Sequence, residues 1–181
     1  MLVLVGMHYA FFPLSFNDLA LKGSENVLGP GMLVSNIAQG GAVLCVSLKT
    51  KNRDLKQLAG SAGLTALLGI TEPAMYGVTM KLKKPLIAVC SGGALAGLYI
   101  GLMGVVRYSS GAPGLASIAI FIGENTMNIV HALIGCAIAF VSAFALTWII
   151  GFEDHANEDD QIEDESLGEV SVDKAPLMNK I

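Results

Sequence analysis

Long apolar stretches, separated by short polar segments, make up most of residues 1–152. Residues 86–106 contain no charged side chain, and residues 129–150 contain a single ionisable group, His131. A helix needs about 20 mainly apolar residues to cross a bilayer, so both stretches predict transmembrane helices. Residues 28–48 are a third candidate, although serine, amide side chains and paired glycines make them polar for a lipid-facing helix. We therefore expect this third helix to pack inside the protein.

The composition agrees with a membrane protein. Apolar residues make up 53% of the chain and charged residues 14%, and the mean hydropathy is +0.61. These values lie far from the usual composition of a soluble globular domain. Cys45, Cys90 and Cys136 lie far apart and show none of the spacings typical of metal or redox sites, so we expect packing residues. We accordingly expect no metal site and no cofactor.

Two clusters of basic residues indicate the orientation of the chain. Lys and Arg concentrate in cytoplasmic loops, so "KTKNRDLK" at residues 49–56 and "KLKK" at residues 81–84 should both be cytoplasmic. Only 24 residues, 57–80, separate the clusters, whereas crossing the membrane and returning takes about 40 residues. The segment must enter and leave by the same face, which predicts a re-entrant hairpin with "GITEPAMYG" at its tip.

The same count assigns the remaining segments. Residues 86–106 should cross outward, and residues 129–150 should return to the cytoplasm. Between them, residues 107–128 contain one apolar run of about ten residues, which is too short to span and predicts a second re-entrant or interfacial segment. Counting backward gives three more elements: an outward-running helix at 1–14, an external loop at 15–27 and the inward-running helix at 28–48.

Charge divides the chain into two parts. Residues 1–152 hold nine Lys or Arg against five Asp or Glu, whereas residues 153–181 hold two against ten. The acidic part has no apolar periodicity, so it cannot bury enough surface to offset the entropy lost on ordering. We expect an all-α polytopic membrane protein with re-entrant hairpins over residues 1–152, followed by a disordered acidic linker that lies in the cytoplasm.

Small residues recur at helical spacing along two of the predicted spans. Such stripes let neighbouring helices approach closely within the bilayer. The stronger stripe consists of Gly93, Gly97 and Gly101, and the weaker one of Gly135, Ala139, Ala143 and Thr147. We expect both stripes to be helix contacts rather than ligand contacts.

A glutamate at membrane depth is the first candidate for a functional residue. A carboxylate there costs roughly 2.5–3.5 kcal/mol on insertion scales, so Glu72 is expected to be functional. The alternative is a solvated Glu72 at the cytoplasmic mouth, beside Pro73. His8 is a second candidate, with a hydrogen-bonded interior histidine as the alternative. Asn36 and Gln39 lie three residues apart on one helical face, where they either line a polar pathway or bond to another helix.

The chemistry of these side chains suits two kinds of ligand. A carboxylate that accepts paired hydroxyl bonds, together with amide and imidazole groups, is typical of a site for a neutral polyhydroxylated molecule. A sugar fits this description. A cation or proton pathway also fits a glutamate and a histidine inside a membrane, so residue chemistry leaves both possibilities open.

Three segments carry a family pattern: "GMHYAFFP" at residues 6–13, "MLVSNIAQGGAVLCVSLKTKN" at 32–52 and "GITEPAMYGVTMKLKKP" at 69–85. Together they resemble the membrane-spanning IIC component of the bacterial phosphoenolpyruvate-dependent sugar phosphotransferase system, in the glucose, sucrose and β-glucoside superfamily. "GVVRYSSGAPGLASIAIFIG" and the closing "LTWIIGFED" favour the β-glucoside branch. The resemblance runs almost continuously through residues 1–154.

The resemblance implies sugar transport coupled to phosphorylation. In this family the IIC domain binds a sugar outside and carries it inward, where a IIB domain phosphorylates it. The resemblance implies that Glu72 and His8 contact the sugar, and we expect Asn36, Gln39 and Thr71 to complete the substrate-binding set. The phosphorylated cysteine belongs to IIB and the phosphorylated histidine to IIA, so we expect no catalytic residue in this chain.

The resemblance also implies partners and a location. The expected partners are a β-glucoside or related glycoside, IIB and IIA domains, the lipid bilayer of the bacterial inner membrane and a second copy of the intact permease; no nucleic acid is expected. A full IIC domain is longer, so we expect the C-terminal portion of one here, with a linker that stops before a IIA domain. Two other readings stay open: an ion-coupled secondary transporter and an inactive permease fragment.

Overall fold

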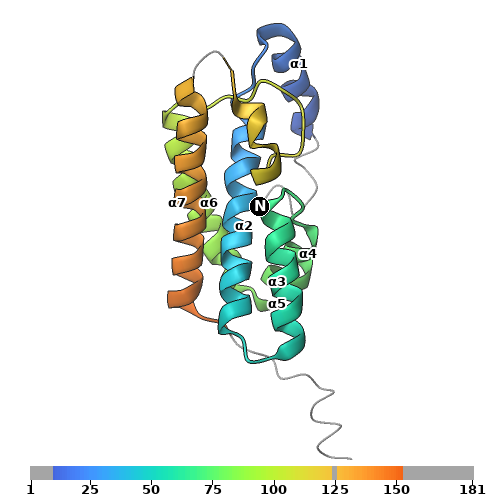
Figure 1. Ribbon diagram of the computed structural model, residues 1–181, viewed down its shortest axis with the longest axis vertical. Coiled ribbons are helices and arrows are strands. Elements are labelled where there is room, and N and C mark those ends of the chain that lie inside the picture. The colour runs from blue at the N-terminus through green and yellow to red at the C-terminus, as the bar shows by residue number, and fades with distance from the viewer. Residues whose placement is uncertain (1–9, 124–125, 153–181) are drawn as a thin grey trace, which may run out of the picture.

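The regular secondary structure of the described residues is helical (Figure 1). The structure, a computed structural model, describes residues 10–123 and 126–152. Its elements are α1 (Phe12–Lys22), α2 (Leu28–Lys49), α3 (Arg53–Leu67), α4 (Glu72–Ala74), the π-helix η2 (Met75–Thr79), α5 (Met80–Leu82), α6 (Lys84–Leu102), the 3-10 helix η3 (Leu115–Phe121) and α7 (Thr126–Ile150). Within the described ranges, β-type pairing is limited to one antiparallel bridge, between Glu25 and Arg107. The predicted all-α fold is confirmed.

Three sequence predictions concern residues outside the described ranges. These are the greater part of the helix at 1–14, the candidate ligand His8 and the disordered linker at 153–181. They stay predictions.

Helix α2 lies at the centre of the bundle. Figure 1 shows it between α3 on one side and α6 and α7 on the other. One hydrophobic core joins Leu33 and Ile37 of α2 to α6 and α7, and a second joins Val43 and Val46 of α2 to α3 and η2. The most apolar stretch of α2 is 67% buried, whereas the corresponding stretches of α6 and α7 are 33% and 28% buried. The prediction that residues 28–48 pack inside the protein is confirmed.

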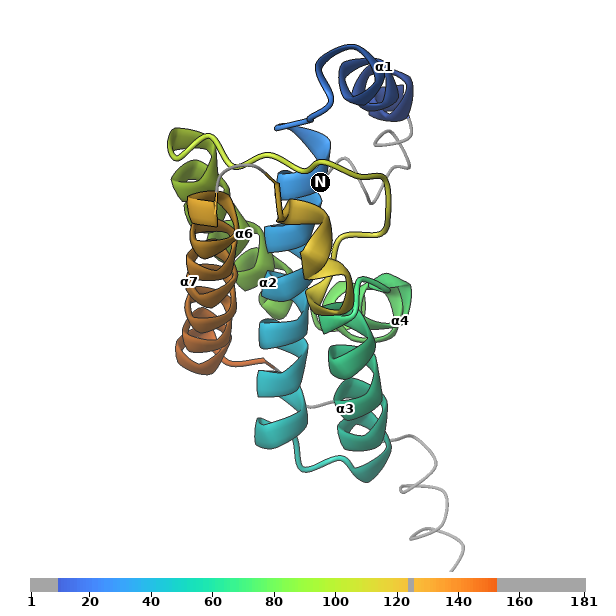
Figure 2. The same ribbon diagram turned by 45° about the horizontal axis from the view of Figure 1, so that its top comes forward.

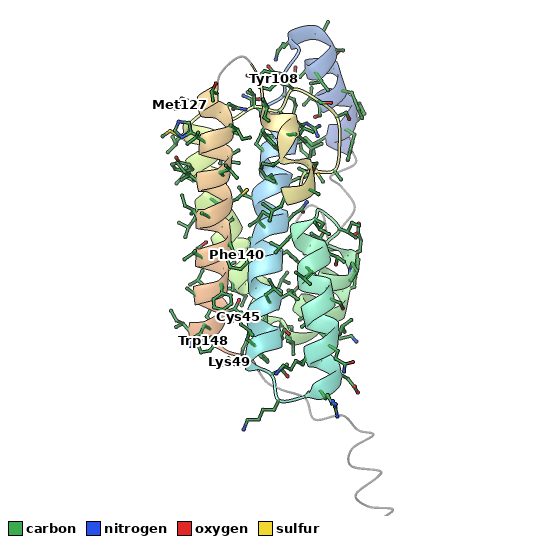
Figure 3. The ribbon with its side chains drawn as sticks, viewed as in Figure 1. Cys45, Lys49, Tyr108, Met127, Phe140 and Trp148 are labelled. Atoms are coloured by element: carbon green, nitrogen blue, oxygen red, sulfur yellow. The ribbon has the colours of Figure 1, made fainter. Side chains whose placement is uncertain are left out.

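Helices α2, α6 and α7 are the three described helices that are long and apolar enough to cross a bilayer. Helix α6 runs antiparallel to the other two (Figure 1). At one end of the bundle, the Lys49 Nζ atom donates a 2.8 Å hydrogen bond to the carbonyl oxygen of Trp148 and lies 5.5 Å from the centre of its ring (Figure 3). Both basic clusters lie at this end, which we call the basic end. The spans predicted at 86–106 and 129–150 are confirmed as α6 and α7.

The first re-entrant hairpin starts at the basic end and reaches about halfway along α2. Asn52 caps α3, because its side-chain oxygen accepts hydrogen bonds of 2.9 and 3.1 Å from two backbone N–H groups. Helix α3 then follows α2 until the Leu67 side chain packs on Gly40. There the chain turns and returns through α4, η2 and α5 (Figure 2). The hairpin predicted at 57–80 is confirmed as a helical hairpin, with α3 beginning a few residues earlier. That both its ends lie on the cytoplasmic side of a membrane stays a prediction.

A second inserted segment enters from the opposite end of the bundle and meets the hairpin. Asn128 closes the base of this segment with two 2.7 Å hydrogen bonds to backbone carbonyl oxygens. At the tip, Gly114 lies so close to Leu68 that a Cβ atom on it would overlap the Leu68 backbone. Figure 2 shows η3 beside α2, above the turn between α3 and α4. The described part of residues 107–128 therefore does not span, as predicted, and the two inserted tips touch each other.

The external loop predicted at residues 15–27 is wrong over its first half, which belongs to α1. Pro13 lies in the first turn, where its missing N–H is not needed, and Gly23 ends the helix with a φ of 70°. Asp18 and Lys22 form a 2.9 Å ion pair one turn apart on the helix surface. Apolar length did not indicate α1, because its 11 residues are too few to cross a membrane.

Helices α6 and α7 pack through small residues, but the stripe on α6 differs from the predicted one. A Cβ atom on Gly92 would lie 2.8 Å from the backbone nitrogen of Ala143, so these two helices approach closely. The buried stripe continues at helical spacing through Ala88, Ala96 and Ile100. A Cβ atom on Gly97 or Gly101 would meet no described atom within 4 Å, so the predicted helix contact is wrong there. The stripe on α7 is buried, as predicted.

Accessibility of single cysteines should report the orientation of the hairpin. In a background without native cysteines, we expect Lys51→Cys and Lys83→Cys to react with a membrane-impermeant maleimide from the cytoplasmic side. Ser110→Cys, at the opposite end, should react from outside. All three positions are exposed, so burial does not limit the reaction. Labelling of Lys51→Cys and Lys83→Cys from opposite sides would contradict the re-entrant hairpin.

Candidate functional site

A cavity of about 280 Å³ lies between α2, the hairpin and α6. Its volume is close to the lower limit of small-molecule pockets, roughly 300–1,000 Å³. The lining residues are Ser35, Asn36 and Gln39 from α2, Thr71 and Met75 from the hairpin, and Leu86, Val89, Cys90, Gly93 and Ala94 from α6. The structure therefore brings together three residues of the predicted substrate-binding set: Asn36, Gln39 and Thr71.

The two side-chain amides of α2 are held in defined orientations. Asn36 Nδ2 donates a 2.7 Å hydrogen bond to the carbonyl oxygen of Pro113, at the tip of the second inserted segment. Gln39 Nε2 donates to Thr79 Oγ1 at 3.1 Å, and that hydroxyl donates to the Met75 carbonyl oxygen at 3.2 Å. Because both NH₂ groups face acceptors, each amide keeps a carbonyl oxygen that accepts no hydrogen bond from a described residue. Two acceptors are thus available at the cavity wall.

The partner of Gln39 is presented by the π-helix η2. The Met80 N–H bonds to the Met75 carbonyl oxygen, five residues earlier, so this turn is wider than an α-helical one. Thr79 is fully buried, and its hydroxyl bridges Gln39 and the same Met75 carbonyl. Such π-turns inside helices occur frequently at functional sites. Here the wide turn couples the returning arm of the hairpin to the polar wall of the cavity.

Helix α6 supplies a wall of apolar and small residues. Between Leu86 and Ala94, each lining residue has another one three or four positions away, so they share one face of the helix. Cys90 is one of them and is only half-buried, whereas Cys45 and Cys136 are buried. The prediction that the cysteines are packing residues is confirmed for the two buried ones. Cys90 also lines the cavity, which the spacing of the cysteines did not indicate.

Glu72 lies beside the cavity rather than in its wall. Thr71 lines the cavity and precedes α4, and Glu72 is the first residue of that short helix. The Glu72 side chain is exposed, and its carboxylate makes no hydrogen bond with the described part of the chain. The structure thus places Glu72 next to a lining residue at the hairpin tip. The roles of Glu72 and of His8, which lies outside the described residues, stay predictions.

A buried ion pair fixes the end of the bundle opposite the basic end. Arg107 Nε lies 2.8 Å from Glu25 Oε2, and the two side chains are 4% and 1% exposed. The Arg107 guanidinium also donates a 2.8 Å hydrogen bond to the Ser15 hydroxyl and a 3.4 Å bond to the Gly111 carbonyl. We call Ser15, Glu25 and Arg107 the clasp, since they join α1, the start of α2 and the second inserted segment.

Glu25 also caps α2. Its carboxylate accepts hydrogen bonds from the backbone N–H groups of Val27 and Gly29, at 2.7 and 2.9 Å, and from that of Leu28. A carboxylate at a helix N-terminus is stabilised by these free N–H groups and by the helix dipole. Sequence reasoning missed the clasp. The available signal was a single arginine in a segment predicted to lie outside, where basic residues are expected to be sparse.

The described residues contain no group of three or more His, Cys, Asp or Glu side chains that could hold a metal ion. The lining residues of the cavity supply amide and hydroxyl groups, one thiol and apolar surface. Such a site can orient a hydroxylated molecule between a polar wall and an apolar wall.

Comparison with known proteins identifies the family of the chain. The model of the family described as "Phosphotransferase system, EIIC" matches residues 1–93. The PTS system beta-glucoside-specific EIIBCA component of Bacillus subtilis is 40% identical over 182 aligned positions, which cover 100% of this chain and 29% of that protein. The PTS system arbutin-, cellobiose-, and salicin-specific EIIBC component of Escherichia coli is 41% identical over 156 positions, 85% of this chain and 32% of that protein. The PTS system sucrose-specific EIIBC component of Bacillus subtilis is 40% identical over 161 positions, 89% of this chain and 34% of that protein.

The chain thus spans about a third of the length of these curated relatives, between 29% and 34%. No solved structure matches it. The matched residues 1–93 include α2, the whole hairpin and all polar lining residues of the cavity. The chain belongs to the EIIC family of the phosphotransferase system.

Proposed function

We propose that residues 1–152 form part of the sugar-translocation pathway of a phosphotransferase-system permease, and that the cavity beside α2 binds the sugar. The observation that carries this proposal is the orientation of Asn36 and Gln39, whose amide oxygens are left as acceptors at the cavity wall. Sugar hydroxyl groups are donors that need such acceptors. Glu72 and Thr71 at the hairpin tip, together with His8, complete the proposed substrate-binding set.

A β-glucoside is the proposed substrate. The names of two relatives refer to β-glucosides, one as "beta-glucoside-specific" and one as "arbutin-, cellobiose-, and salicin-specific". A third relative is named sucrose-specific. These names support a glycoside rather than an ion as the transported molecule. The sequence resemblance also favours the β-glucoside branch.

The names of the relatives also support a coupling to phosphorylation. EIIBCA and EIIBC components combine the C component with a B component, and in one case with an A component. We therefore assign IIB and IIA domains as partners, homodimerisation to the intact permease, and residues 153–181 to the linker before IIA. The basic end, with Lys49 and the two basic clusters, is assigned to the cytoplasmic face of the inner membrane.

Alkylation of Cys90 tests the sugar site directly. The test protein is the β-glucoside permease of Bacillus subtilis with this chain in place of its matching segment, which we call the chimeric permease. For this labelling experiment alone, a variant is used in which every cysteine except Cys90 is replaced; uptake is measured with the IIB cysteine in place. A bound sugar fills the cavity that Cys90 lines, so a saturating β-glucoside should slow maleimide labelling of Cys90 at least about tenfold, as expected for at least about 90% occupancy. Mannitol is the control polyol. Equal labelling rates with and without β-glucoside would contradict the proposal.

Uptake by the chimeric permease should depend on phosphoenolpyruvate and should deliver a phosphorylated sugar. The reason is that phosphate from the IIA and IIB domains traps the sugar at the cytoplasmic face. The measurement is accumulation of a labelled β-glucoside in vesicles, with and without phosphoenolpyruvate. Uptake driven by a proton gradient, with unmodified sugar inside, would instead support the ion-coupled alternative.

A further inference from the structure

We propose that the α6 wall of the cavity binds the aglycone, the non-sugar group of a glycoside, and that Gly93 determines how large this group can be. The proposal rests on the proposed sugar site and adds the part of the substrate that this wall selects.

The first support is the separation of polar and apolar groups around the cavity. Its amide and hydroxyl groups come from α2 and from Thr71 of the hairpin, whereas α6 contributes Leu86, Val89, Cys90, Gly93 and Ala94. Sugar hydroxyls need hydrogen-bond partners, while an apolar substituent is stabilised by removing its surface from water. A molecule that suits both walls at once carries a hydroxylated ring and an apolar substituent, as an aryl glycoside does.

The second support is the space at Gly93. A Cβ atom there would come no closer than 3.9 Å to its nearest described neighbour, the Ala38 Cβ atom, which is an ordinary van der Waals distance. Gly92, one residue earlier, differs, because a Cβ atom on it would collide with the backbone of Ala143. Helix packing therefore requires a glycine at position 92 but not at position 93. The missing side chain of Gly93 leaves open volume in the cavity instead.

The third support is the gradation of side-chain size along this face. The lining residues decrease in size from Leu86 and Val89, near the basic end, to Gly93 and Ala94, further along α6. The side chains of α6 therefore fill the least of the cavity at Gly93 and Ala94. We place the aglycone at this part of the α6 wall, with the sugar ring against Asn36 and Gln39.

Substitution of Gly93 in the chimeric permease tests the assignment. In a hydrophobic pocket, small changes in occupied volume alter selectivity roughly 10–200-fold. Gly93→Val should therefore weaken binding of 4-nitrophenyl β-D-glucoside at least about tenfold, and that of methyl β-D-glucoside less than about twofold. Gly93→Ala should shift the ratio of the two affinities in the same direction by a smaller factor. Gly97→Val, in open space one turn away and outside the cavity wall, is the matched control and should leave the ratio unchanged.

Three outcomes are distinguishable. An equal loss for both glycosides, or an unchanged ratio in both Gly93 variants, would overturn the assignment of the α6 wall. If Gly93→Val does not fold, the ratio measured for Gly93→Ala decides. A parent protein that binds neither glycoside would instead contradict the proposed sugar site, and the aglycone assignment that rests on it would fall with it.

Discussion

Replacement of Glu25 with glutamine is expected to lower the free energy of unfolding by roughly 3–5 kcal/mol, the usual cost of removing one partner of a buried ion pair. The side chains of Arg107 and Glu25 are 4% and 1% exposed, so the guanidinium cannot turn to water when its partner changes. Its other acceptors are the neutral Ser15 hydroxyl and Gly111 carbonyl. The variant therefore buries a charge without a counter-charge.

Removal of the other partner of the ion pair should lower the free energy of unfolding by less. Arg107→Met leaves the Glu25 carboxylate at the N-terminus of α2, where three backbone N–H groups still donate to it. The helix dipole and these donors compensate part of the lost charge, so we expect the destabilisation to be smaller by about 1–2 kcal/mol. In the double variant neither charge is left alone, and its loss should be less than the sum of the two single losses.

Unfolding of the purified protein in detergent, followed by the fluorescence of Trp148, the single tryptophan, measures these differences. Asp18→Asn is the matched control, because it removes the ion pair with Lys22 on the surface of α1, where the lysine side chain is 67% exposed. Exposed pairs contribute about 0–1 kcal/mol. A Glu25→Gln variant as stable as Asp18→Asn would show that the clasp does not hold this end of the bundle. A smaller loss for Glu25→Gln than for Arg107→Met would contradict the compensation of the Glu25 charge by the N-terminus of α2.

The spans and the hairpin could be predicted because they follow from constraints that act along the chain. Apolar length determines which segments can cross a bilayer, and this placed α6 and α7 within a few residues of their ends. The short distance between two basic clusters excluded a pair of crossings at residues 57–80. Residues 28–48 are an apolar stretch that contains several polar side chains, which indicated an interior helix. Helix α2 is the most buried of the three described helices that could cross a bilayer.

The clasp and the packed stripe of α6 could not be predicted, because both depend on how helices are rotated and which distant residues meet. Glu25 and Arg107 come from segments that only the fold brings together. On α6, two stripes of small residues lie side by side at the same spacing, one through Gly92 and one through Gly93. Sequence periodicity does not distinguish which of them faces α7, and the wider glycine pattern pointed to the wrong one.

Three of the four residues with an amide or hydroxyl group in the cavity wall were predicted, and Ser35 was not. Asn36 and Gln39 are unusual in an apolar helix, and Thr71 belongs to the conspicuous turn beside Glu72, so their chemistry identified them. The other wall of the cavity consists of ordinary small and apolar residues of α6. Their role comes only from facing the cavity, and no sequence property separates them from residues of α6 that face elsewhere.

Exchange of Glu72 for glutamine is expected to weaken binding of a β-glucoside at least about tenfold in the chimeric permease, since 1.4 kcal/mol corresponds to one decade. Glutamine keeps the shape of the side chain and one acceptor oxygen, but it replaces the second acceptor with a donor and removes the charge. Each charge-assisted hydrogen bond to a sugar hydroxyl contributes roughly 1.5–3 kcal/mol, so the loss of one bond is sufficient.

The position of Glu72 makes this prediction specific to binding. Its exposed carboxylate makes no hydrogen bond with the described residues, so the same variant should leave the free energy of unfolding within about 0.5 kcal/mol of the parent. Glu72→Asp should also bind poorly, because its shorter side chain withdraws the two oxygens from the ligand while the hairpin backbone stays fixed. A loss of stability equal to the loss of affinity would make Glu72 a structural residue.

Equilibrium binding of a labelled β-glucoside to Glu72→Gln across pH separates the two remaining roles of this carboxylate. A sugar-binding carboxylate loses affinity at every pH at which the parent is ionised, because the charged acceptor is missing throughout that range. A proton carrier behaves differently, since glutamine resembles its protonated form and can preserve sugar binding while the pH dependence disappears. Weak binding by the variant at neutral pH therefore supports the sugar site at the hairpin tip. Preserved affinity without pH dependence would assign Glu72 to ion coupling and overturn its role in binding sugar.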